Sequence, residues 1–368
     1  MTFIHHIETL APGPGRTQSD LCEIMLGRTD DKRTRRYIKK AHADSGIQTR
    51  HSVLADFDKE SPVPGIFRHA DGSLKDPSTG ERNEVFVNEA KRLLPELAGR
   101  AIDRCPGIGV DDITHVITVS CTGFFNPGPD LCLVDSLGLS SAVQRYQLGF
   151  MGCYAAIPAL RMADQFCRAD PSAVVLVTCI ELCTLHMQSS GDLDSVVANS
   201  VFADGLAAAL VSARQPAASQ RAFAISHFAS GLAREGVNDM AWDIGDTGFK
   251  MILSKYVSRI IGAGIKEIVD AAFAASGRSA DGIRTWAVHP GGRAILDTVE
   301  SSLNLRPEDI AASRETLSRY GNMSSATILY VLAAVLHDPG TRDGESVCAL
   351  AFGPGLTIET SVLDAVVS

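Results

Sequence analysis

The chain has 368 residues, 45% of them apolar and 21% charged, and a formal net charge of -9 at pH 7. This length suggests two domains or one duplicated domain, and the composition is that of a globular protein with a large core. The negative charge argues against a nucleic-acid-binding protein, because such proteins usually carry a basic excess or a basic stripe.

The chain has nine cysteines, an odd number, and no CxxC pair. This spacing signals neither a zinc cluster nor a disulfide framework, so we expect reduced thiols and no metal. The N-terminal residues MTFIHHIETLAPGPG lack a charged leader followed by an apolar stretch, and no apolar run approaches the roughly 20 residues that span a bilayer. These features predict a cytoplasmic protein without a membrane span.

The predicted elements follow one plan twice. In chain order, a strand that ends at a polar corner, a glycine-rich entry into an apolar helix and a second strand are predicted at residues 111–123, 149–163 and 173–181. The same order returns at residues 281–292, 320–336 and 346–355, at an offset of about 170 residues each time. In this repeat, His289 falls where Cys121 falls. A nearly constant offset over three segments indicates two similar halves.

The alternation of strands and helices predicts an α/β fold. Apolar strands such as AVVLVT in residues 173–178 suit a sheet that helices cover on both faces. The polar, small-residue stretch at residues 212–222 is a plausible linker. We therefore predict an N-terminal half at residues 1–215 and a C-terminal half at residues 216–368.

Cys153 is the first candidate nucleophile. It lies at the mouth of a predicted helix, after Gly149 and Gly152. A thiol at a helix N-terminus gains from the positive end of the helix dipole, and the glycines would let the backbone approach an acyl group. The alternative is a small residue in a tight helix–sheet contact, and spacing alone does not decide between the two.

His289 and Asn322 are the other candidates for chemistry. His289 ends the apolar strand TWAV, before Pro290 and two glycines; taken alone, it is more simply a hydrogen-bonded histidine at a strand end. Asn322 precedes the last long helix, where asparagine commonly serves as the N-cap. The repeat places both residues opposite the Cys121 corner and the Cys153 helix entry, so the three could converge.

Such a set suits a Claisen condensation. The thiol would hold an acyl chain as a thioester, and the His–Asn pair would stabilise an enolate without a metal. His289 would also raise the thiolate population of Cys153 by ion pairing.

Three motifs resemble the chalcone synthase superfamily, the type III polyketide synthases: WAVHPGGRAILDTVE, YGNMSSATILYVL and AFGPGLTIET. GFMGCYAA looks like the bacterial form of the nucleophile motif. The resemblance covers residues 28 to the C-terminus. It implies a thiolase fold with αβαβα layers, a homodimer, acyl-CoA starters, malonyl-CoA extenders and no resident cofactor.

The resemblance also assigns site residues. Cys153, His289 and Asn322 match the catalytic triad, and Phe202 and Phe249 match two gatekeeper phenylalanines; the alternative for these two is a pair of core aromatics. Further residues match positions that line the reaction cavity, namely Cys121, Glu181, Cys183, His186, Ser324, Gly353 and Pro354.

Some positions depart from the plant members of the family or match it loosely. Cys121 stands where those enzymes have threonine, which resembles bacterial enzymes that form resorcinols, pyrones or naphthalenes. Asn126 replaces a methionine that reaches across the dimer, which puts a shared cavity in doubt. Arg28, in the basic run RTDDKRTRRYIKK, and Arg293 are the expected CoA contacts; that run could equally be a solvated helix face.

Two other functions remain open at this point. A β-ketoacyl carrier-protein synthase of the initiating type shares the fold and the triad, although GNMSS and FGPGLTIE favour the polyketide synthase. A non-catalytic scaffold of the same fold is the other. Because Cys121 and Cys183 replace hydroxyl groups, we expect fatty acyl starters and resorcinol or pyrone products.

Overall fold

The computed structural model describes residues 1–57, 65–69, 71, 73–218, 220–254 and 256–367. Its largest sheet has nine strands in the order β11-β12-β13-β8-β1-β7-β6-β4-β5. The two ends of this sheet belong to the two halves of the chain, and the only link between them in the described sheet is the short pairing of β1 with β8 through Thr2–Ile4.

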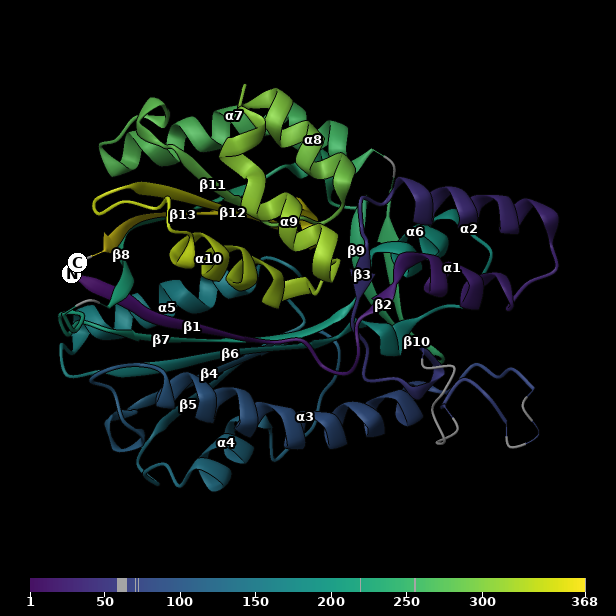
Figure 1. The fold of residues 1–368 in the computed structure, drawn as a ribbon, viewed down its shortest axis with the longest axis horizontal. Helices are drawn as coiled ribbons and strands as arrows, with labels where there is room; N and C mark the ends of the chain where they lie inside the picture. Colours follow the sequence, from purple (N-terminus) through teal and green to yellow (C-terminus); the bar gives the residue numbers. More distant parts are fainter. Residues whose placement is uncertain (58–64, 70, 72, 219, 255, 368) are drawn as a thin grey trace.

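The N-terminal half of the sheet consists of β1 (Thr2–Leu10), β4 (His115–Ser120), β5 (Gln144–Gly149), β6 (Val174–Leu182) and β7 (Asp204–Ser212). All residues of β4, β6 and β7 are buried, because these apolar strands have helices on both faces. One outer layer covers this half, formed by α3 (Thr79–Asp103) and α4 (Pro129–Leu137) (Figure 1).

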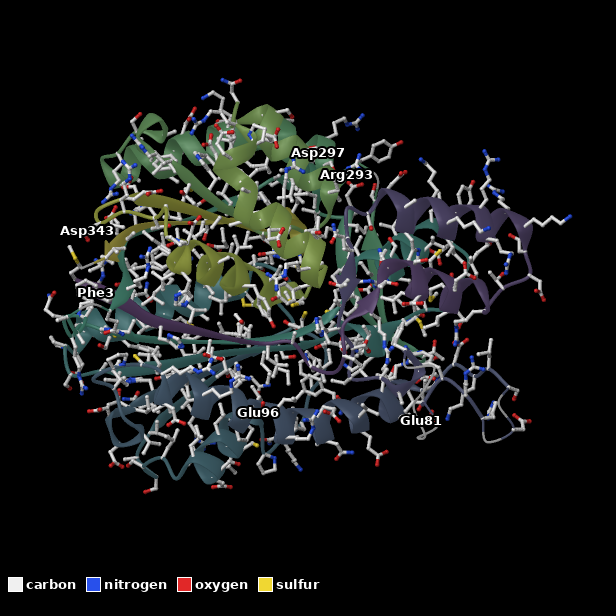
Figure 2. All side chains as sticks on the ribbon, in the orientation of Figure 1. Phe3, Glu81, Glu96, Arg293, Asp297 and Asp343 are labelled. Atoms are coloured by element: carbon white, nitrogen blue, oxygen red, sulfur yellow. The ribbon has the colours of Figure 1, made fainter. Side chains whose placement is uncertain are left out.

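The C-terminal half consists of β8 (Arg221–Leu232), β11 (Thr285–Val288), β12 (Ser346–Gly353) and β13 (Thr357–Val367). The opposite outer layer is formed by α7 (Val257–Ser276), α8 (Arg293–Ser302) and α9 (Ala311–Tyr320). Charged side chains of the two outer layers, such as Glu96 on α3 and Asp297 on α8, point away from the sheets (Figure 2).

Two helices lie between the halves of the sheet: α5 (Ala156–Ala169) and α10 (Thr327–His337). Nearly all of α10 is apolar and buried, as expected for a helix surrounded by protein. Residues of both helices and of both sheet halves form one hydrophobic core. The result is five layers, helix–sheet–helix–sheet–helix, as the sequence predicts.

The repeat is visible in the topology. β4, α5 and β6 occupy places equivalent to those of β11, α10 and β12, and each first strand runs parallel to its partner. β5 has no counterpart among the described strands of the second half. The predicted linker lies between β7 and β8, and we retain the boundary after residue 215 as a proposal.

The remaining elements gather at one end of the molecule, on the right of Figure 1. They are α1 (Gln18–Leu26), α2 (Lys32–Asp44), α6 (Leu193–Val201), β2 (Arg16–Thr17), β3 (Thr49–Arg50) and a hairpin of β9 (Met240–Gly245) and β10 (Gly248–Leu253). Within the described residues, no helix has the length and apolar character needed to cross a membrane.

Candidate active site

Cys153 lies in the turn between β5 and α5, and its side chain is buried. The turn is tight: Gly152 has φ of 87° and its carbonyl accepts a hydrogen bond from the Ala155 amide at 3.1 Å. The loop after β12 packs directly against it, since a Cβ added to Gly152 would lie 2.5 Å from Cδ of Pro354. The sequence therefore places the thiol at the entry of α5, as predicted.

Asn322 connects the surroundings of the thiol to the His289 loop. Its Nδ2 donates to the Gly291 carbonyl at 3.2 Å, and its Oδ1 accepts from the Ser324 amide at 2.9 Å. The side chains of Asn322 and Ser324 lie close enough to the Cys153 thiol to lower its pKa. Two backbone hydrogen bonds, to Val201 and from Ala203, fix the position of Asn322. Asn322 is thus a bridging residue as well as the residue that precedes the helix.

His289 directly follows β11, and its backbone amide donates to the Leu350 carbonyl at 2.7 Å. The imidazole is 1% exposed, and neither ring nitrogen has a hydrogen-bond partner among the described residues. Buried polar groups are normally bonded, so a ring with both nitrogens unoccupied by described residues is free to bond to a substrate. This argues against a merely hydrogen-bonded histidine at a strand end.

Burial opposes charge on both candidate groups. It raises the pKa of Cys153 to about 12, assisted by the nearby Glu181 carboxylate and opposed by Ser324 and Asn322. Burial also lowers the pKa of His289 to about 3. Desolvation therefore works against the expected ion pair of thiolate and imidazolium, which stays a prediction.

A buried carboxylate lies behind the site. Glu181, at the end of β6, accepts hydrogen bonds from Ser325 Oγ at 2.5 Å, Thr122 Oγ1 at 2.9 Å and the Cys121 amide at 3.1 Å. Burial raises its pKa to about 7, although these hydrogen bonds oppose the rise. The Cys121 thiol contacts Glu181 Oε2 at 3.4 Å and Ser324 Oγ at 3.1 Å. Cys121 therefore contacts the Ser324 hydroxyl, and Ser324 lines the same cavity as Cys153.

Cys153 opens onto a small cavity, which we call the thiol cavity. Its free volume is about 20 Å³, and its walls include six residues from the cysteine corner, the hairpin and the C-terminal loop: Cys121, Cys183, Met240, Trp242, Ser324 and Pro354. Of the predicted cavity residues, Gly353 instead packs against Tyr154, where a Cβ would lie 2.4 Å from the ring.

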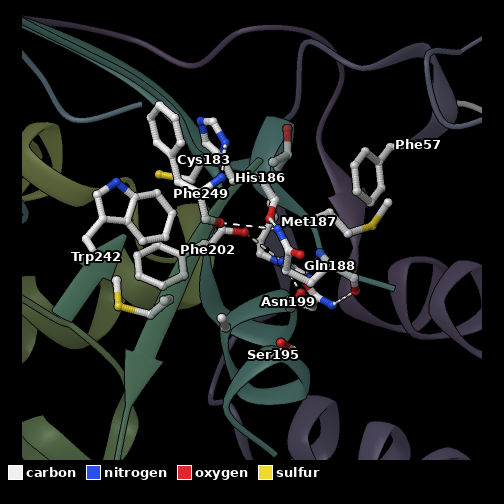
Figure 3. A pocket seen from close by; sticks show the side chains of 14 residues that line it. Phe57, Cys183, His186, Met187, Gln188, Ser195, Asn199, Phe202, Trp242 and Phe249 are labelled. Atoms are coloured by element: carbon white, nitrogen blue, oxygen red, sulfur yellow. Dashed lines mark hydrogen bonds between the residues drawn. The ribbon is translucent and has the colours of Figure 1, made fainter. Parts of the chain in front are cut away.

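A second cavity, of about 30 Å³, adjoins the first and shares lining residues with it. Phe202, Trp242 and Phe249 line one side of it, and Gln188 and Asn199 line the other (Figure 3). Both predicted gatekeeper phenylalanines therefore face cavities. Arg50 donates to the Phe202 carbonyl at 2.7 Å, which holds the chain at that position.

His186 also lines the second cavity, and its ring stacks on Phe249 with 4.1 Å between centroids. Its Nε2 bonds to the Thr122 carbonyl at 2.7 Å and its Nδ1 accepts from the Phe249 amide at 3.0 Å. Burial lowers the pKa of His186 to about 3, so the ring is neutral. Both ring nitrogens are occupied by the protein itself.

The sequence analysis missed three cavity residues on the hairpin of β9 and β10: Met240, Trp242 and Met251. A signal was present, because apolar residues alternate on both sides of Gly245-Asp-Thr-Gly248. Alternation around a two-residue turn is typical of a hairpin. Which face of the hairpin contacts the cavities depends on tertiary packing, so the alternation alone does not predict it.

Arg28 and Arg293 occupy different surroundings. The Arg28 side chain is 7% exposed, bonds to Ser189 Oγ at 2.6 Å and Asp76 Oδ1 at 3.3 Å, and packs over the Phe67 ring. It lies in neither cavity near Cys153. Arg293 is exposed and lines an open groove of about 640 Å³, together with Gly291. This groove borders the His289 loop.

Asn126 precedes Pro127 in a cis peptide bond and lines an open hollow beside the edge strand β5. It lines neither the thiol cavity nor the pocket of Phe202 and Phe249. In the described part of the protein, no group of three His, Cys, Asp or Glu side chains is placed to hold a metal ion.

Comparisons with known proteins identify the family. Residues 4–215 match the N-terminal domain of chalcone and stilbene synthases, and residues 228–367 match the C-terminal domain. The chain is 31% identical to the alpha-pyrone synthesis polyketide synthase-like Pks18 of Mycobacterium tuberculosis, over 99% of this chain and 92% of that protein. It is 30% identical to probable polyketide synthase 1 of Dictyostelium discoideum, but it spans only 12% of that protein's length.

Solved structures agree. The brown algal enzyme PKS-I from Ectocarpus siliculosus superposes with a TM-score of 0.92 at 28% identity, over 99% of this chain and 98% of that one. The type III polyketide synthase domain of Steely1, a type I/III hybrid from Dictyostelium, gives 0.90 at 30% identity, over 100% and 99%. The 1,3,6,8-tetrahydroxynaphthalene synthase of Streptomyces coelicolor gives 0.87 at 28% identity, over the whole of both chains.

These similarities confirm the predicted thiolase fold and favour the polyketide synthase over the carrier-protein synthase and the scaffold. The chain therefore belongs to the chalcone and stilbene synthase family and is a type III polyketide synthase.

Proposed function

We propose that the enzyme loads an acyl group from acyl-CoA onto Cys153 and extends it with units from malonyl-CoA, with His289 and Asn322 as the enolate donors. The observation that carries this proposal is the bridging position of Asn322. Its side chain meets the Cys153 thiol on one side and the loop of the unpartnered His289 on the other.

Loading exchanges one thioester for another. The Cys153 sulfur bonds to the acyl carbon, the bond from that carbon to the CoA sulfur breaks, and the thiol proton passes through His289 to the departing CoA thiolate. A histidine beside a thiol is the usual acceptor of such a proton in cysteine nucleophiles.

Extension uses the same donors. Malonyl-CoA loses carbon dioxide, and the electrons of the broken bond form the enolate of acetyl-CoA. His289 donates to the enolate oxygen through its N–H, and Asn322 donates through the Nδ2 hydrogen that Gly291 does not use. The enolate carbon then attacks the acyl thioester, and the Cys153 sulfur leaves and regains a proton.

The route to the thiol passes Phe202 and Phe249, which line the second cavity (Figure 3). Arg293 lines the groove beside Gly291, and we propose that it meets a phosphate of CoA there. The contacts of Arg28 with Asp76 and Ser189 weaken its candidacy as a CoA ligand. Cyclization of the extended chain would give a pyrone or an aromatic ring, the product classes that two relatives' names state for those proteins.

We further propose a cytoplasmic homodimer. β5 is the edge strand at one end of the described sheet, and most of its residues are exposed. The unpaired backbone groups of an edge strand can hydrogen bond to a second chain. All nine cysteines are free, which suits a reducing compartment. Sedimentation velocity would test the dimer: a single monomeric species at micromolar concentration would contradict it.

The experiment that tests the donor roles measures carbon dioxide release and condensation separately. His289→Ala and Asn322→Ala should each lower malonyl-CoA decarboxylation by about 10²-fold or more, because each removes one donor to the enolate. Acylation of Cys153 in the Asn322→Ala variant should persist. Decarboxylation at the wild-type rate in both variants would contradict the assignment.

A further inference from the structure

The thiol cavity and the second cavity share a wall. Four residues line both of them: Cys183, Phe202, Trp242 and Met251. Trp242 and Met251 are direct cross-strand partners on the hairpin of β9 and β10, so they stand side by side on its cavity face. An acyl chain carried by Cys153 would lie against the thiol-cavity side of this wall.

Trp242 is the fixed member of the wall. Its indole Nε1 donates to the Cys121 carbonyl at 2.7 Å. His186 and Phe249 contact the indole edge-on, with centroids 5.6 and 5.8 Å away and interplanar angles of 88°. The Phe202 ring packs on it at 6.5 Å. A hydrogen bond and three aromatic contacts therefore hold one orientation of the ring.

The other hairpin residues are adaptable. Met240 and Met251 have unbranched side chains that can change rotamer and make room for a substrate. The free volumes of about 20 and 30 Å³ are close to the space of one or two water molecules. Rotation of the methionines can admit a short acyl chain, whereas a long chain would require the indole to leave its position.

We infer that Trp242 limits the length of the acyl chain that Cys153 can carry, so that this enzyme uses short acyl starters. This inference rests on the proposed function, and it replaces the fatty starters expected from Cys121 and Cys183. The side chains at those two positions are apolar, as expected, but the Trp242 indole lines the same cavity and limits its volume.

The test compares starter lengths. Wild-type enzyme, Trp242→Ala and the control Ile244→Ala are assayed with malonyl-CoA and acetyl-, hexanoyl- or dodecanoyl-CoA, and products are identified by mass spectrometry. Ile244 lies on the same hairpin but its side chain is exposed, so the control reports disturbance of the hairpin itself.

The wild type should show the highest kcat/KM with a short starter. Trp242→Ala should raise the ratio of kcat/KM for dodecanoyl-CoA to that for acetyl-CoA at least tenfold, because each methylene admitted to an apolar cavity is worth about fourfold. Replacing the indole by a methyl group leaves an apolar space, and an engineered apolar cavity of about 150 Å³ is large enough to bind benzene. Part of a longer acyl chain should therefore fit there. Ile244→Ala should keep the wild-type ratio.

Three results would overturn the inference. The first is a preference of the wild-type enzyme for dodecanoyl-CoA, a result that can be observed without any variant. Another is an unchanged ratio in Trp242→Ala, or in Trp242→Leu if the alanine variant does not fold. The third, no malonyl-CoA turnover by the wild type with any starter, would also overturn the proposed function, whereas the first two would leave it intact.

Discussion

Glu181 is a carboxyl group buried behind Cys121, and among the described residues no counter-charge contacts it. Its four hydrogen-bond donors, the Ser325 and Thr122 hydroxyls and the amide and thiol of Cys121, are all uncharged. Burial raises its pKa from 4.5 to about 7, so the folded protein holds this proton more tightly than the unfolded chain does. The pH dependence of stability should therefore carry a contribution from this one residue.

The stabilising effect of that proton is fully present below pH 4.5 and is lost as the pH rises towards 7. Glu181→Gln removes this loss. Between pH 5 and pH 8, the fall in the free energy of unfolding should be smaller in the variant by about 2 to 3 kcal/mol. The free energy of unfolding of both proteins is measured by denaturant titration at the two pH values.

Glu315→Gln is the control, because this glutamate is exposed on α9. It should keep the wild-type dependence on pH. If Glu181→Gln and the wild type lose the same free energy between the two pH values, Glu181 does not hold the proton as described.

At the residue scale, the convergence of the Cys153 turn, the His289 loop and Asn322 was predictable because each lies in a repeated pattern of the sequence. The shifts of the Cys153 and His289 pKa values were not, because they depend on burial that arises only when the two halves meet. Arg28 illustrates the same limit: its charge suggested a phosphate contact, but Asp76, Ser189 and the Phe67 ring surround it.

Among the elements, the turn that carries Cys153 depends on its contact with the loop after β12. Gly152 has φ of 87° and faces Pro354, so a Cβ there would both strain the backbone and lie 2.5 Å from Cδ of the proline. Either the thiol turn or the loop must move. A displacement of about 1 Å at a reacting group can cost 10²-fold in rate.

Gly152→Ala should therefore slow acyl loading at least tenfold. Gly344→Ala provides a matched control: Gly344 also has positive φ, of 71°, but nothing lies within 4 Å of an added Cβ. Both variants should lose a similar free energy of unfolding from backbone strain, roughly 1 kcal/mol. Loading measured by stopped reaction and mass spectrometry should be slow only in Gly152→Ala; equal rates in the two variants would show that the contact with Pro354 does not position the thiol.

The elements differ in how well the sequence predicts them. Strands and helices of the repeat were predictable because a continuous apolar run or an apolar helical pattern marks each of them. The hairpin of β9 and β10 carries an equally clear alternation, yet its role depends on which of its faces meets the cavities. Trp242 therefore remained hidden until its contacts with Cys121, His186 and Phe249 were visible.

For the whole molecule, duplication explains how one active site draws on both ends of the chain. Equivalent positions in the two halves, at the ends of β4 and β11 and at the entries of α5 and α10, face each other around the central helices. The sequence predicted this convergence because the offset of the repeat is constant. It could not predict that the two sheet halves join through β1 and β8 or that β5 lacks a counterpart.

The central claim is that one cysteine, Cys153, carries the acyl chain. Intact-protein mass spectrometry after incubation with a short-chain acyl-CoA tests it most directly, using the wild type, Cys153→Ala and Cys121→Ser. The Cys121 variant controls for the thiol that shares Ser324 with Cys153. We predict one acyl adduct on the wild type and on Cys121→Ser, and none on Cys153→Ala. An adduct that persists on Cys153→Ala, or one that disappears from folded Cys121→Ser, would contradict the account.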